Sequence, residues 1–165
     1  MSEYLGKTVR DRISGVTGIA DQYIEKLSCA SQYAIQPLGD GKTLPDSWAF
    51  DVINLEVVDG PTIDVVPADA SVVVKLGDKV RDVIVGTEGV AVKRATYING
   101  CVFFTVSGHV DKPMLKDDPG TAVVVHSQLE VIDAGWFGRV NPKTASAQVG
   151  TAPVTGGPRE RAYRP

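Results

Sequence analysis

The sequence predicts an all-β protein, on the basis of its composition and its hydrophobic pattern. Valine occurs 25 times among 165 residues and leucine 8 times, and β-branched side chains suit a pleated sheet better than a helix. The run GDKVRDVI (77–84) alternates as a half-buried strand does. The 17 glycines and 10 prolines supply the turns that short strands need. At 43% hydrophobic residues, the chain suits one ordinary domain or two very small ones.

An internal duplication organises the chain. The sixteen residues LGKTVRDRISGVTGIA (5–20) share nine identities with LGDKVRDVIVGTEGVA (76–91), all at an offset of 71. The likeness resumes between NLEVVDG (54–60) and QLEVIDAG (128–135), where the offset is 74. Insertions in turns account for this drift, and one inserted residue would align Cys29 with Cys101. The sequence therefore predicts two similar units.

Each unit is expected to hold four or five short strands. In the second unit, VAVKRATYI (90–98) and CVFFTVS (101–107) follow the opening strand, and TAVVVHSQLEVID (121–133) has room for two more. That number of strands in about 60 residues is typical of an SH3-like barrel. The first unit repeats this order. Its stretch IADQYIEKL (19–27) has helix-like spacing, but the duplication predicts a strand there.

Turn residues mark the expected hairpins. A pair of glycines flanks the short polar turn after the first strand of each unit, where glycine takes a positive φ without a Cβ clash. An Asn-Gly dipeptide is a strong signal for the next hairpin of the second unit. The predicted structural turn residues are Gly15, Gly18, Gly86, Gly89, Asn99 and Gly100.

The predicted architecture is two tandem SH3-like β-barrels and an extended C-terminal tail. The boundaries are 1–60 for the first unit, 61–75 for a linker or edge strand, 76–135 for the second unit and 136–165 for the tail. The composition of the tail cannot build a core. Candidate partner contacts in the tail are Trp136, Phe137, Arg139, Arg159, Arg161, Tyr163 and Arg164. For Trp136 and Phe137, packing on the second unit is the preferred interpretation, and contact with a neighbouring subunit is the alternative.

Charge is uneven along the chain, whose net charge is −3. Residues 136–165 carry five basic side chains and one acidic one, whereas residues 1–135 carry 12 basic and 19 acidic side chains. An acidic body is repelled by phosphate backbones, so nucleic acid is not the expected partner. The basic tail either meets an acidic partner or is solvated. No apolar run approaches the length of about 20 residues that spans a bilayer, and no signal peptide is evident, so we expect synthesis in the cytoplasm and no membrane partner.

No constellation typical of catalysis occurs, so the sequence predicts neither an enzyme nor a cofactor. The two cysteines are expected to be free, buried thiols at strand starts, without a zinc site. His109 lies near Asp111, Asp117 and Asp118 in one loop, which could ligate a hard cation, although a solvated acidic loop is the preferred interpretation and no metal is predicted. His126 has no partner that the sequence identifies.

The string LGDKVRDVIVGTEGVAVKRATYINGC (76–101), with the later SQLEVID (127–133), resembles a family of small tailed-bacteriophage proteins. Their pattern runs Leu-Gly-Asp-Lys-Val, Gly-x-x-Gly, Tyr-x-Asn-Gly-Cys and Leu-Glu-Val-Val. The first copy departs from this pattern, because Lys7 replaces the acid of the opening turn and EKLSC (25–29) replaces the Asn-Gly-Cys hairpin. The opening also resembles the KOW type of SH3-like module.

The phage resemblance implies a structural protein of the virion, and we expect a capsid decoration (cement) protein that binds the shell through its barrel surfaces and tail. The expected partners are other virion proteins, first the major capsid protein, and a homo-oligomer is left open. One alternative is a neck or tail accessory protein. Another is a nucleic-acid-binding or host-protein-binding module of KOW or Tudor type. The acidic body counts against nucleic-acid binding, whereas a host-protein inhibitor would use that acidic surface to mimic nucleic acid.

Overall fold

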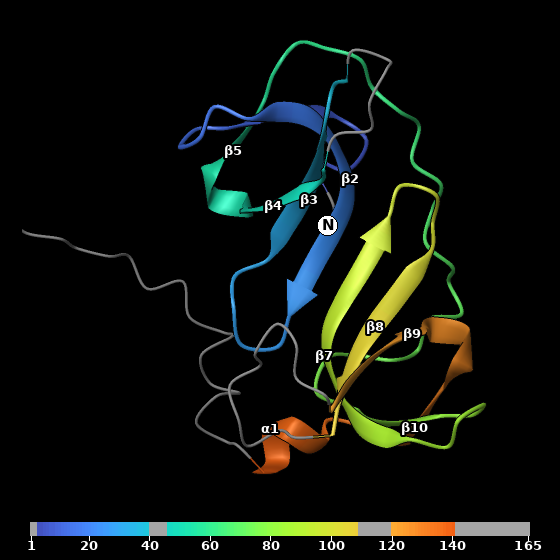
Figure 1. Cartoon of the computed structure of the whole chain (residues 1–165). Helices are drawn as coiled ribbons and strands as arrows, with labels where there is room; N and C mark the ends of the chain where they lie inside the picture. Colours follow the sequence, from blue (N-terminus) through green and yellow to red (C-terminus); the bar gives the residue numbers. More distant parts are fainter. Residues whose placement is uncertain (1–2, 40–45, 109–119, 141–165) are drawn as a thin grey trace, which may run out of the picture.

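Ten strands and one helix make up the computed structural model, which describes residues 3–39, 46–108 and 120–140. All ten strands belong to one sheet, and every strand pair in it is antiparallel (Figure 1). The prediction of an all-β protein is therefore confirmed.

The two units have the same elements in the same order. The first contains β1 (Thr8–Asp11), β2 (Thr17–Lys26), β3 (Gln32–Pro37), β4 (Trp48–Asp51), the 3-10 turn η1 (Val52–Asn54) and β5 (Leu55–Val57). The second contains β6 (Lys79–Asp82), β7 (Glu88–Tyr97), β8 (Val102–Ser107), β9 (Thr121–Val125), η2 (His126–Gln128) and β10 (Leu129–Asp133). The stretch with helix-like spacing is thus a strand, β2, as its copy predicts.

The strand registers show where the two copies differ in length. Equivalent strand pairs keep the offset of 71 through β3 and β8, including a bulge after Ala20 and its counterpart after Ala91. From β4 and β9 onward the offset is 74. All three extra residues therefore lie in the loop between β8 and β9. The predicted insertion before the third strand is wrong, and Cys29 is not the counterpart of Cys101.

Neither unit closes by strand pairing. Within each unit the strands pair in the order β5-β1-β2-β3-β4 or β10-β6-β7-β8-β9, and the two end strands do not pair with each other. A three-residue 3-10 turn carries the chain straight from one end strand into the other, so these strands do not run side by side. The prediction of two SH3-like barrels is not confirmed, since each unit is an open sheet.

Each unit has its own hydrophobic core, built from alternate residues of its strands. The first core contains Val9, Tyr33, Ile35 and Leu55, and the second contains Val80, Phe104, Val106 and Leu129. Equivalent positions fill equivalent places, so Tyr33 corresponds to Phe104 and Ile35 to Val106. Complete burial of such side chains contributes about 1.5–3 kcal/mol each, which makes these cores the main stabilising element of each unit.

The two units are joined by pairing of β2 with β7, which we call the junction. Its five pairs run from Gln22 opposite Tyr97 to Lys26 opposite Lys93. At the centre Ile24 lies opposite Ala95, its own counterpart in the duplication. The register is therefore the same when the two copies are exchanged, as in an isologous dimer interface. The two units are related by a pseudo-two-fold axis at Ile24 and Ala95.

Hydrogen bonds beyond the junction are reciprocal as well. Leu27 N–H donates to Val92 O at 2.9 Å, and its counterpart Ile98 N–H donates to Asp21 O at 3.0 Å. Ile98 packs against the first core, although it belongs to the second unit. Charged side chains also face each other across the junction. Burial and the facing Lys26 lower the pKa of Lys93. The junction thus combines backbone pairing with side chains that cross it.

The segment 61–75 contains no strand, yet it is held to both units. Ile63 N–H donates to Gly6 O at 2.8 Å, and Val66 N–H donates to Ile98 O at 2.8 Å. Val74 is buried in the second core. The segment is therefore a linker packed along the sheet.

The predicted extended conformation of the tail is wrong at its start, because Trp136–Val140 form the short helix α1. Phe137 N–H donates to Gly77 O at 2.9 Å, and Arg139 donates to Ala134 O at 2.6 Å and forms an ion pair with Asp133. These contacts place the helix on the second unit, as the preferred interpretation of Trp136 and Phe137 predicts. Arg159, Arg161, Tyr163 and Arg164 lie outside the described residues.

Two of the predicted turn glycines have a different role. Gly15, Gly86 and Gly100 have a positive φ, which confirms them as turn residues. Gly18 and Gly89 lie inside β2 and β7 and have no positive φ. A Cβ on Gly18 would lie 2.2 Å from Gln36 O, and one on Gly89 would lie 2.7 Å from Ser107 O. These two positions lack a side chain because the neighbouring strand passes too close.

Replacing Gly89 with alanine should therefore lower the free energy of unfolding by about 1–3 kcal/mol, the usual cost of overpacking. Chemical denaturation measures this change. Gly108→Ala is the matched control, because a Cβ there would meet nothing closer than Gly120 O at 3.7 Å. Equal stability of the two variants would contradict the close approach of the strands.

Candidate interaction sites at the hairpin tips

The β1–β2 and β6–β7 hairpins end in two equivalent turns, residues 12–16 and 83–87, which we call the hairpin tips. A buried aspartate organises each tip. Asp11 Oδ2 accepts hydrogen bonds from Ser14 N–H and Ser14 Oγ–H, both at 2.7 Å. Asp82 Oδ1 accepts from Ile84 N–H at 2.8 Å and from Val85 N–H at 3.2 Å. The hydrogen bond from Ser14 N–H is the main cause that lowers the pKa of Asp11, so its carboxylate stays charged.

Each hairpin tip is also fixed against the 3-10 turn of its unit. Arg12 N–H donates to Asn54 O in the first unit, and Val83 N–H donates to Gln128 O in the second, both at 2.9 Å. These bonds place the two tips identically relative to their cores. The tips are therefore defined surfaces and not merely loose loops.

Exposed apolar side chains project from both hairpin tips. Ile13 is 78% exposed and its counterpart Ile84 is 70% exposed. Val83 and Val85 flank Ile84 and are also exposed, so three consecutive apolar residues form the second tip. In the first unit the residues that flank Ile13 are instead polar, Arg12 and Ser14, and the further exposed apolar side chain is Ile53 of η1, the turn to which Arg12 N–H is bonded. Each unit thus presents an exposed isoleucine at the same end, and in the second unit two valines enlarge this apolar surface.

Ion pairs lie next to each hairpin tip. In the first unit Glu56 pairs with Arg10 and Arg12. In the second unit Glu88 pairs with Lys79 at 3.1 Å and with Arg81 at 2.6 Å. Hydrogen bonds from Arg10 and Arg81 are the main causes that lower the pKa of Glu56 and Glu88. These exposed pairs contribute little stability, but they place charged side chains next to each tip.

The nine identities of the duplication separate into structural residues and residues without a structural role. Core packing, turn geometry or close approach of strands accounts for seven of them: Leu5/Leu76, Gly6/Gly77, Val9/Val80, Asp11/Asp82, Gly15/Gly86, Gly18/Gly89 and Ala20/Ala91. Arg10/Arg81 form the ion pairs. Only Ile13/Ile84 are large, apolar, exposed and unexplained by folding. Single exposed apolar residues are ordinary, but the retention of this one in both copies marks it as a candidate contact residue.

Other candidates from the sequence do not join these tips. Trp136 and Phe137 are half-buried against the second unit. The free cysteines Cys29 and Cys101 are exposed, so the prediction of buried thiols is wrong. Both lie in turns that connect strands, and neither is in a core. The loop with His109 and its aspartates lies outside the described residues.

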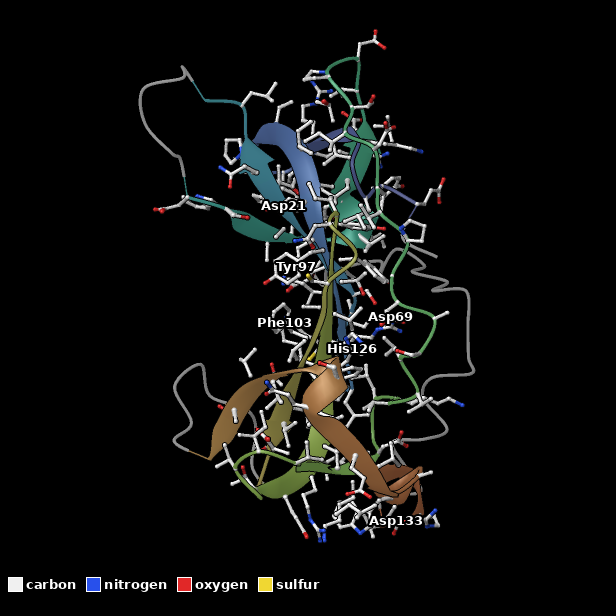
Figure 2. The ribbon with its side chains drawn as sticks, turned by 90° about the vertical axis from the view of Figure 1, so that its right-hand side faces the viewer. Asp21, Asp69, Tyr97, Phe103, His126 and Asp133 are labelled. Atoms are coloured by element: carbon white, nitrogen blue, oxygen red, sulfur yellow. The ribbon has the colours of Figure 1, made fainter. Side chains whose placement is uncertain are left out.

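His126 has a partner that the sequence does not reveal. Its Nε2 lies 3.4 Å from Asp69 Oδ2, on the linker (Figure 2). This contact ties the linker to η2. Among residues 3–39, 46–108 and 120–140, no group of three or more His, Cys, Asp or Glu side chains could hold a metal ion. In the same residues no helix is long and apolar enough to cross a membrane.

Replacing Asp82 with alanine should remove both acceptor bonds at the second hairpin tip. The expected loss is about 1–3 kcal/mol in the free energy of unfolding, for two hydrogen bonds of ordinary net value. Hydrogen exchange at the amides of Ile84 and Val85 should also accelerate. Asp82→Asn is the control, because its amide oxygen keeps an acceptor at Oδ1. Unchanged exchange in the alanine variant would show that the carboxylate does not organise the tip.

Comparisons with known proteins identify no relative. No family model matches the chain, and no curated protein or solved structure is significantly similar to it. The resemblance to small tailed-phage proteins thus stays a prediction that rests on the motifs of the repeat.

Proposed function

We propose that the protein is a structural protein of a tailed-phage virion, and specifically a capsid decoration protein that attaches through its two hairpin tips. The motifs of residues 76–101 and 127–133 suggest the phage origin. The two tips supply the means of attachment. A neck or tail location is the alternative placement within the same particle.

The observation that carries this proposal is the repetition of one exposed apolar tip within one continuous sheet. Single exposed apolar side chains are ordinary, but one that both copies of a duplication keep without a role in folding is a candidate for a protein–protein contact. Two linked contacts bind far more tightly than one, because the second binds at high effective concentration. A particle surface, which repeats the same subunit many times, suits such a protein.

The charge of the body favours a protein partner over nucleic acid. Residues 1–135 carry 19 acidic and 12 basic side chains. Four of the basic side chains in or next to the tips, Lys79, Arg81, Arg10 and Arg12, are paired with glutamate. Few basic groups there remain to neutralise phosphates. The KOW-type alternative therefore has less support.

Purified particles of the phage that encodes the chain should contain the protein in a fixed ratio to a shell, neck or tail subunit. Quantitative mass spectrometry of gradient-purified particles measures this ratio. A ratio to the major capsid protein supports decoration, whereas a few copies per particle support the neck or tail. A phage replication protein serves as the control for contamination. Absence of the chain from clean particles would refute the proposal.

A further inference from the structure

We infer that one chain bridges two identical partner subunits related by a two-fold axis, with one hairpin tip on each. This inference rests on the proposed function and specifies the arrangement of the partner. It follows from the symmetry of the junction and from the chemistry that both tips share.

The junction makes the two units equivalent. Exchange of the copies turns the pair Gln22–Tyr97 into Lys26–Lys93 and leaves Ile24–Ala95 at the centre. The reciprocal bonds of Leu27 and Ile98 obey the same exchange. Backbone pairing fixes the relative orientation of the units, because ten strands belong to one sheet. Any surface present in both units is therefore repeated about the pseudo-two-fold axis.

The hairpin tips lie at opposite ends of the molecule. In Figure 1 the blue β1–β2 hairpin points to the upper left, and the yellow-green β6–β7 hairpin points to the lower right. A half-turn in the plane of the picture brings one onto the other, together with the 3-10 turns that support them. The tips cannot both enter one small pocket, so they contact two separate places.

The shared chemistry of the tips indicates that those two places are the same. Both tips carry an exposed isoleucine at the same position of the repeat, on a turn that an equivalent buried aspartate and an equivalent hydrogen bond to the 3-10 turn hold in place. The side chains beside that isoleucine differ, since Arg12 and Ser14 stand where the second tip has Val83 and Val85. The isoleucine that both tips share fits an apolar depression with a polar rim. Two identical depressions related by a two-fold axis occur in a homo-oligomer with that symmetry.

Surfaces present in only one unit would give a different stoichiometry. The exposed Val123 of β9 corresponds to Ala49, and the exposed Val73 of the linker has no counterpart. Contacts through either would bind one chain to one partner subunit. The retained isoleucines therefore distinguish two-fold binding from one-sided binding.

The first experiment measures binding to particles that lack the chain. Wild-type protein and the variants Ile13→Asp, Ile84→Asp and the double variant are added back to such particles, and half-saturation is measured by co-sedimentation. Either single variant should bind about 100-fold more weakly or worse, because it loses linked binding. The double variant should not bind. Val73→Asp, at a site that is also 70% exposed, should bind like wild type.

The second experiment identifies what each tip contacts. A photo-reactive amino acid replaces Ile13 in one protein and Ile84 in another, and each is cross-linked on the particle. Mass spectrometry should find the same segment of the same partner protein in both cases. Melting curves of all variants should match wild type, since both isoleucines are exposed.

The outcomes separate the two proposals. Wild-type protein that does not bind particles would refute the virion function, and this inference with it. Wild-type binding that only one of the single variants weakens, or neither, would overturn the two-fold arrangement alone. Cross-links from the two tips to different partner segments would also overturn it.

Discussion

The antiparallel pairing of β2 with β7 is the interaction on which the rest of the structure depends. Without it, residues 22–26 of β2 and 93–97 of β7 would be open sheet edges, and Ile24, now buried at the centre of the junction, would be exposed. Unpaired edges invite aggregation, and in this chain each copy covers the edge of the other. Since the register is unchanged by exchange of the copies, the pairing also sets the symmetry of the molecule. The tandem chain has the geometry of a dimer whose subunits are covalently joined.

This constraint links the fold to the proposed role. The cores, the buried aspartates and the 3-10 turns position each hairpin tip within its own unit. The junction then positions the two tips relative to each other. The linker is hydrogen-bonded to Gly6 and Ile98 and packs along the sheet, so it does not act as a free spacer between the two tips. Binding through both tips would therefore require little ordering of the protein, which favours affinity.

Much of the fold could be predicted from the sequence, because the duplication provides two different sequences for each strand and both must suit the same structure. The strand at 19–27 was recoverable only in this way, since its apolar spacing is that of a helix. The junction was not predictable, because Ile24 and Ala95 differ in kind and pairing between distant strands leaves no local pattern. The role of Gly18 and Gly89 was also hidden, because close approach of a neighbouring strand depends on the register. The repeat singles out Ile13 and Ile84 as identical positions. An apolar residue in a strand-like run is predicted to lie in the core, however, and only the structure shows that both side chains are exposed.

The register of the junction can be tested directly by nuclear Overhauser measurements on the labelled protein. Leu27 and Val92 form a hydrogen-bonded pair. Because such pairs alternate with non-hydrogen-bonded ones, Ile24 and Ala95 form a close, non-hydrogen-bonded pair with Cα atoms about 4.5 Å apart. The account predicts a strong cross-peak between their Hα protons. An Hα contact from Ile24 to Lys93 or Tyr97 instead, or none to β7, would show that the two copies are not joined about Ile24 and Ala95.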